Sequence, residues 1–253
     1  MQHRFISIVC SNCGRIQYVP IYCGDRFCPV CSVRRLARVR HRLGWLIEQG
    51  KLKQLGQFRH VTLTIVSHDS LRPMVRRLLN GFKRLRSRRV WRMAVKGGAY
   101  VVEVTSSDAG WHAHLHIIVQ GDFIPWRQLR DAWRAITGAT GCFITRIPAS
   151  ACIMYLTKYL TKVEAPETDV PLISECLSKV RLFNPFGAWH AINRGYVAPL
   201  HPCLGCGRVG TYMPFWLVYG GDRWVVMDVD EVQRLNSTRA APTQASATPA
   251  PAG

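Results

Sequence analysis

Residues 111–119 read Trp-His-Ala-His-Leu-His-Ile-Ile-Val, an alternation of histidine with apolar side chains. Because successive side chains of a strand point to opposite faces, His112, His114 and His116 share one face and the apolar residues share the other. The pattern therefore predicts a strand whose apolar face lies in a core. A second strand pattern covers residues 99–105, and the turn-forming residues 106–110 between the two predict a hairpin.

Working outward from this hairpin, strand and helix patterns alternate along the chain. Residues 60–66 have strand composition, with valine, leucine and isoleucine alternating against Thr62 and Thr64. Strands joined both by hairpins and by helices predict an α+β fold with a largely antiparallel sheet. The other elements that we expect are helices over residues 33–55, 73–91 (interrupted or weakened at Gly81), 126–136 and 149–163, and a strand over residues 143–147.

The histidine row is a candidate metal site. Two imidazoles two residues apart on a strand are well placed to chelate one divalent ion, and the hairpin brings Glu103 close enough to supply a carboxylate. A mixed imidazole and carboxylate set suits Mn²⁺, Mg²⁺ or Zn²⁺, with open positions for phosphate oxygens. The alternative is a solvated row of histidines.

A second cluster of reactive side chains lies on the expected helix 149–163. At about 100° per residue, Tyr155, Lys158, Tyr159 and Lys162 occupy a single arc roughly 100° wide. A phenol is a poor nucleophile because its reference pKa is about 10, and a neighbouring ammonium favours the phenolate and can also hold a phosphate oxygen. The helix therefore offers a candidate nucleophile beside candidate metal ligands.

The charge of the chain indicates a polyanionic partner. The 34 Lys and Arg residues exceed the 15 Asp and Glu residues, which gives a net charge of +19 and a pI of about 10.1. The apolar stretches fall far short of the roughly 20 residues of a spanning helix, so we expect no membrane residence. Helix 33–55 is basic, and the candidate DNA-binding side chains of the next helical region are Arg76, Arg77, Lys83, Arg84, Arg86, Arg88 and Arg89.

The ten cysteines include two matched pairs near the N-terminus. Cys10-x-x-Cys13 and Cys28-x-x-Cys31 together supply the four thiolates of a tetrahedral structural zinc site, with Cys23 as a fifth candidate. The N-terminus lacks the apolar core of a signal peptide, so we expect reduced thiols in the bacterial cytoplasm. The further pair Cys203-x-x-Cys206 is either half of a second site or two ordinary thiols.

These motifs, taken in order, resemble those of a known superfamily. Thr62-Leu63-Thr64, His114-Leu115-His116 and Tyr155-x-x-Lys158-Tyr159-x-x-Lys162 are similar to the three motifs of the HUH endonucleases, and within them of the two-tyrosine rolling-circle initiators of plasmids and small phages. The similarity covers residues 58–163. An N-terminal cysteine cluster ahead of the nuclease is also similar to some replication proteins of this kind.

The resemblance implies a fold, a site and a reaction. It implies a ferredoxin-like or RNA-recognition-like nuclease fold with the histidine strand in the middle of the sheet. His114 and His116 would hold Mg²⁺ or Mn²⁺ with Glu103, or with His112 as the second choice. Tyr159 would be the principal nucleophile and Tyr155 the second, nicking single-stranded origin DNA through a 5′-phosphotyrosine.

The resemblance also implies partners and an order of domains. The chain has no Gly-x-x-x-x-Gly-Lys-Ser/Thr loop, so we expect a host helicase to unwind DNA and a host polymerase to extend the 3′ end. We expect a zinc-ribbon-like module and basic helix over residues 1–55, the nuclease core over 56–165, a packed extension over 166–235 and a disordered tail over 236–253.

Three alternatives stay open. A two-tyrosine transposase would use the same chemistry at transposon ends. A mobilisation relaxase is less favoured because those enzymes usually place their tyrosine ahead of the histidine motif. A non-catalytic zinc-ribbon regulator would bind DNA without cleaving it, with a structural metal on its histidines.

Overall fold

The computed structural model describes residues 5–20, 23, 25–107, 110–160, 165–198, 202–209, 212–219 and 224–228. The chain divides into two compact units. One consists of residues 23–198, and the other combines residues 1–22 with residues 199–253. Within the described ranges, no helix combines the length and hydrophobicity that crossing a bilayer requires.

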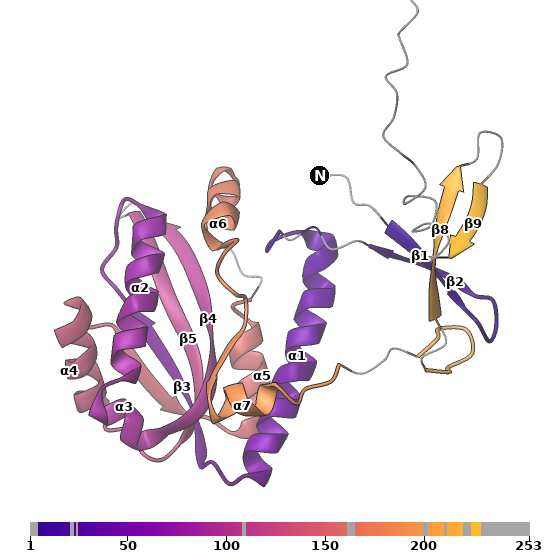
Figure 1. The fold of residues 1–253 in the computed structure, drawn as a ribbon. Helices are drawn as coiled ribbons and strands as arrows, with labels where there is room; N and C mark the ends of the chain where they lie inside the picture. The colour runs from indigo at the N-terminus through magenta and orange to yellow at the C-terminus, as the bar shows by residue number, and fades with distance from the viewer. Residues whose placement is uncertain are drawn as a thin grey trace, which may run out of the picture. The chain divides into compact units, whose positions relative to one another are not determined.

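The larger unit is built on a five-stranded antiparallel sheet with the order β6-β3-β5-β4-β7 (Figure 1). The central strand, β5, carries the histidine row, and its neighbour β4 forms the predicted hairpin with it. Strands and helices follow each other as β-α-β-β-α-β from β3 to β6. The strands are β3 (Gln57–Thr64), β4 (Val95–Ser107), β5 (Gly110–Gly121), β6 (Cys142–Arg146) and β7 (Asn184–Gly187).

Helices cover both faces of this sheet. Apolar side chains of α2, α3, α4 and α6 pack in a core on one face, and those of α1, α5 and α7 pack in a second core on the other. Figure 1 shows α2 and α4 on the side of the sheet away from α1 and α5. The helices are α1 (Pro29–Leu52), α2 (Leu71–Arg86), α3 (Arg89–Ala94), α4 (Trp126–Thr137), α5 (Ala149–Thr157), α6 (Val170–Leu177) and α7 (Ala188–Asn193), with a 3₁₀ turn at Glu167–Asp169.

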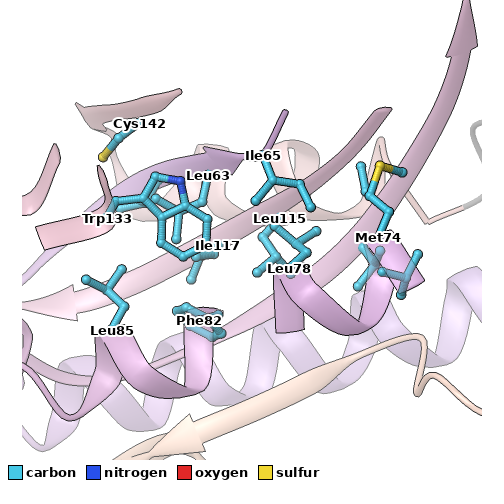
Figure 2. Close-up of a cluster of buried hydrophobic side chains, with 14 of the residues drawn as sticks. Leu63, Ile65, Met74, Leu78, Phe82, Leu85, Leu115, Ile117, Trp133 and Cys142 are labelled. Atoms are coloured by element: carbon cyan, nitrogen blue, oxygen red, sulfur yellow. The ribbon is translucent and has the colours of Figure 1, made fainter. Parts of the chain in front are cut away.

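The alternation along β5 separates core from site. Leu115, Ile117 and Val119 are buried in the first core. Figure 2 shows Leu115 and Ile117 in this core with Leu78 of α2 and Trp133 of α4. The histidines lie on the opposite face, which the second core shares through Ile118, Ala99 and Val101. A strand with two buried faces needs apolar residues on both. The residues of β5 in the two cores are apolar, and the histidines are the exception on the second face.

Several expectations about single elements change in the structure. Gly81 does not interrupt α2, because its missing side chain lets the helix approach α4: an added Cβ would lie 2.9 Å from Thr137 Cγ2. The helix expected over residues 149–163 ends at Thr157, and residues 158–160 form a turn. The basic helix α1 begins at Pro29, with Cys28 as its N-cap, and buries Val39, Leu43, Leu46 and Ile47 in the second core.

The smaller unit contains a four-stranded antiparallel sheet with the order β2-β1-β8-β9. Its strands are β1 (Phe5–Cys10), β2 (Ile16–Pro20), β8 (Tyr212–Tyr219) and β9 (Trp224–Asp228). The division therefore differs from the boundaries expected at residues 55 and 165. The basic helix packs with the larger unit, and the N-terminal strand pairs with β8, which is distant in sequence. The tail expected over residues 236–253 lies outside the described residues.

Candidate active site

The centre of the candidate site is a buried histidine–glutamate pair between β5 and β4. His116 Nε2 lies 2.7 Å from Glu103 Oε2, and the two side chains are 5% and 6% exposed. Strand register explains the meeting, because Glu103 stands opposite His114 on the face that carries His116. The pair brings a carboxylate and an imidazole to one point, as the sequence predicted.

Both tyrosines of the α5 segment lie against this pair. The ring of Tyr159 stacks on the ring of His116, with centroids 3.4 Å apart and planes 1° apart. Tyr155 contacts His60 of β3 at a centroid distance of 5.0 Å. Leu156 and Leu160 are fully buried in the second core and fix the segment over the sheet. The sequence-predicted nucleophiles and the histidine strand are thus in one place.

His60 is a member of this cluster that the sequence analysis did not single out. Its Nε2 lies 3.4 Å from His116 Nδ1, and its ring stacks with those of His116 and Tyr159 at planes 12° apart. Burial, with a smaller effect of His116, lowers the pKa of His60 to about 4, so the ring is neutral near pH 7. The alternation of residues 60–66 contained the signal, since His60 shares its strand face with Thr62.

The remaining predicted histidines stand further along β5. His112 stacks on His114 with centroids 4.5 Å apart, and Ser67 Oγ lies 3.2 Å from His112 Nδ1. The ring centroids of His114 and His116 are 6.1 Å apart. Among the described residues, the groups of three or more potential ligands with mutual distances within 4.8 Å are both cysteine clusters. His116 and Glu103 are therefore together, whereas His114 and His112 are neighbours of that pair rather than part of one tight ligand set.

One of the two predicted lysines lies within the described residues. Lys158 is exposed, and its Nζ lies 5.6 Å from the centroid of the Tyr159 ring. Lys162 lies outside the described residues.

The predicted DNA-binding side chains of α2 and α3 lie across the sheet from the histidines and tyrosines. Their helices pack on the first core, whereas the site opens on the face of the second. Arg76, Arg77 and Arg84 line a cavity of about 460 Å³ beside α4. Arg86 stacks over Phe82 and Phe186, and Lys83, Arg88 and Arg89 complete the basic surface. On the site's own face, the exposed arginines of α1 include Arg34 and Arg38.

The cysteines form two clusters, and neither is the predicted one. Cys10 and Cys13 gather with Cys203 and Cys206 in the smaller unit, whereas Cys28 and Cys31 gather with Cys23 in the larger unit. The structure groups Cys10 and Cys13 with Cys203 and Cys206 of the same unit, and not with Cys28 and Cys31, which lie at the start of α1. Each cluster has thiol ligands that could hold a metal such as zinc.

Comparison with known proteins connects this geometry to replication. Residues 15–123 match the family model described as a replication protein. The chain is similar to replication proteins over this segment. The matched segment runs from β2 of the smaller unit through α1 to just past the end of β5, so it includes His60, Glu103 and the histidine row but stops before α5.

Individual members of the family are similar over part of their length. A "Protein rep" of Staphylococcus aureus is 26% identical over 129 residues, which cover 46% of this chain and 56% of that protein. A "Protein rep" of Bacillus amyloliquefaciens is 25% identical over 111 residues, covering 42% of this chain and 33% of that protein. The chain therefore aligns with between a third and just over half of these relatives. No solved structure matches the chain.

Proposed function

We propose that this replication protein initiates rolling-circle replication of a plasmid or small phage by nicking single-stranded DNA with a tyrosine. The observation that carries the proposal is the stack of Tyr159 on His116, which in turn contacts Glu103. The phenol of Tyr159 contacts the imidazole of His116, and this imidazole contacts the buried carboxylate of Glu103. A metal-assisted phosphodiester transfer to a tyrosine needs these three groups in one place. The similarity of residues 15–123 to the replication protein family supports the same activity.

The reaction that we propose exchanges one phosphodiester for another. Tyr159 loses its phenolic proton, and its oxygen forms a bond to the scissile phosphorus. The bond from phosphorus to the 3′ oxygen of the preceding nucleotide breaks, and that oxygen takes up a proton. The products are a 5′-phosphotyrosine and a free 3′-hydroxyl that a host polymerase can extend. Lys158, beside the Tyr159 ring, favours the phenolate and can hold a phosphate oxygen.

The donor set of the site fits a divalent metal. His116 and Glu103 would hold Mg²⁺ or Mn²⁺ with His114 as the third ligand, and His112 is the second choice for that place. Such an ion would polarise the scissile phosphate and stabilise charge on its oxygens. The proximity of His116 Nε2 and Glu103 Oε2 puts two ligand atoms within reach of one ion, and a shift of the His114 side chain would complete the set.

Tyr155 and Lys162 would act later in the same cycle. We propose that Tyr155, which contacts His60, cleaves the regenerated origin after one round, so that the displaced 3′-hydroxyl can resolve the first linkage. Lys162 would assist as a second cation beside the tyrosines. The strand order β6-β3-β5-β4 over a β-α-β-β-α-β sequence agrees with the ferredoxin-like nuclease fold that such initiators have.

The basic surfaces suggest two modes of DNA contact. Arginines of α1 lie on the site's face of the sheet and would hold the strand that is nicked, largely through its phosphates. Those of α2 and α3 lie on the opposite face and would hold flanking DNA of the origin. A host helicase would open the duplex, and the setting would be the bacterial cytoplasm.

A covalent trapping assay tests the proposal. Purified protein is incubated with single-stranded origin DNA labelled on the 3′ side of the nick, with Mn²⁺ or EDTA, and is resolved on a denaturing gel. We expect a metal-dependent labelled protein band that Tyr159→Phe abolishes. The matched control is Tyr100→Phe, which removes a hydroxyl on the other face of the sheet and should leave the band unchanged.

Tyr155→Phe separates the two tyrosines. It should leave the first adduct intact and slow the closing of circles, measured with a substrate that carries two nick sites. Undiminished adduct in Tyr159→Phe would overturn the assignment of the nucleophile. Tight DNA binding without any adduct would favour a non-catalytic regulator.

A further inference from the structure

Two segments of the smaller unit, offset by 193 residues in the sequence, share one sequence pattern and one backbone conformation. Residues 10–15 and 203–208 both read Cys-x-x-Cys-Gly-Arg. In the first, Cys10 N–H donates to Arg15 O over 2.9 Å and Gly14 N–H donates to Cys10 O over 2.8 Å. In the second, the equivalent bonds join positions 203 with 208 and 207 with 203, each over 2.8 Å. The two segments are therefore the same turn made twice.

The glycine of each turn is required by its backbone. Gly14 and Gly207 have φ values of +69° and +71°, a region that residues with a Cβ rarely adopt. The turn folds the chain back so that both cysteines of a pair present their sulfur atoms on one side. Each turn thus supplies two thiols in a fixed arrangement, as the paired turns of four-cysteine zinc sites do.

The two turns face each other through their thiols. Cys10 Sγ lies 3.7 Å from Cys206 Sγ, and Cys13 Sγ lies 3.6 Å from Cys203 Sγ. All four sulfur atoms lie within 4.8 Å of one another. Zinc–sulfur bonds of about 2.3 Å in a tetrahedron place the sulfurs about 3.8 Å apart, which is close to both distances. A disulfide would need about 2.05 Å.

We propose that Cys10, Cys13, Cys203 and Cys206 bind one structural zinc ion that joins the segment before residues 23–198 to the segment after them. Four thiolates leave no open coordination position, so the ion has a folding role and takes no part in nicking. The site is separate from the cluster of Cys23, Cys28 and Cys31. The inference does not depend on the proposed nuclease activity, because it rests on the smaller unit alone.

The metal content of the purified full-length chain tests this site. We expect Cys13→Ser and Cys206→Ser each to lose one equivalent of zinc, measured by plasma mass spectrometry, and the double variant to lose no more than either single one. Cys176→Ser, a substitution in α6 outside both clusters, is the matched control and should keep all bound metal. Cys28→Ser should keep the equivalent that Cys13→Ser loses.

Cobalt replacement guards against a variant that merely misfolds. Cys206→His keeps a metal-ligating side chain, so it should retain the equivalent while weakening the sulfur-to-cobalt charge-transfer band of the Co²⁺-loaded chain. The proposal is overturned if Cys206→Ser keeps its full zinc content, or if Cys28→Ser and Cys13→Ser remove the same ion while Cys206→Ser does not. The second outcome would restore the pairing of the two N-terminal cysteine pairs.

Discussion

His60 offers a sharp test of how the candidate active site is organised. A metal-bound histidine is held in place by the group that its second ring nitrogen contacts, and removing that group typically weakens metal binding by about 10- to 100-fold. With Nε2 of His116 toward Glu103, the nitrogen left for this role is Nδ1, which faces His60. We therefore expect His60 to orient His116 for the divalent ion.

The magnitude follows from the contact distance. The Nδ1–Nε2 separation of 3.4 Å is longer than the usual 2.7–3.2 Å of a hydrogen bond, so the loss should lie near the lower limit. His60→Phe keeps a ring for Tyr155 and Tyr159 to contact but offers no hydrogen-bonding atom. It should weaken Mn²⁺ binding about 10-fold, or about 1.4 kcal/mol. His60→Gln can still donate or accept and should restore most of that affinity.

The assay is a titration of Mn²⁺ into the protein without DNA, followed by electron paramagnetic resonance of the free ion. His68→Phe is the control, because His68 lies at the far end of β5 beside Trp111. Wild-type Mn²⁺ affinity in His60→Phe would refute the orienting role. Equal losses in the Phe and Gln variants would show that packing, and not the hydrogen bond, is what His60 supplies.

Two further predictions concern DNA contact and stability. Replacing Arg34 and Arg38 of α1 by alanine should weaken binding to a short single strand and lower the slope of log K against log salt concentration by about 1.4. Replacing Arg76 and Arg84 of α2 by alanine should affect only substrates with flanking duplex, and should lower that slope by about 1.8. Fluorescence anisotropy over a salt series measures both effects. Leu115→Ala removes a fully buried side chain beneath the histidine row and should lower the free energy of unfolding by about 2–5 kcal/mol, measured by denaturant titration.

Controls for these two predictions come from the same elements. Equal effects of the α1 and α2 pairs on every substrate would contradict a division of labour between the faces of the sheet. Leu52→Ala makes the same truncation at a residue that is 76% exposed at the end of α1, and should change stability by about 0.5 kcal/mol or less. A similar loss in both leucine variants would argue against the burial of Leu115.

The parts of the fold that depend on local periodicity could be predicted from the sequence. The alternation of residues 111–119 identified a strand with one histidine face, and the turn before it identified the hairpin with β4. Alternate residues of paired strands share one face of the sheet, and from this alternation the sequence predicted that Glu103 lies beside the histidines. The resemblance assigned Tyr159 and His116 to one site, and in the structure their rings are in contact.

The sequence could not predict which surfaces meet over long sequence separations. Periodicity marks the apolar stripe of a helix but not the face of the sheet that it covers, so the position of α2 across the sheet from the tyrosines comes from the structure alone. The cysteine pairs were matched by nearness, although the Cys-x-x-Cys-Gly-Arg pattern of residues 10–15 recurs only at residues 203–208. His60 was passed over because a single histidine beside threonines is an ordinary strand residue.

The two cysteine turns also set an order of events during synthesis. Cys13 leaves the ribosome 190 residues before Cys203, a delay of about 10–40 s at the usual rates of translation. Throughout that interval the larger unit emerges and can fold, while the first pair of thiols waits for the second. Zinc available in the cell would then close the smaller unit last, so a ribosome that stalls after the larger unit and before Cys203 would release a chain with an assembled sheet and an open pair of reactive thiols.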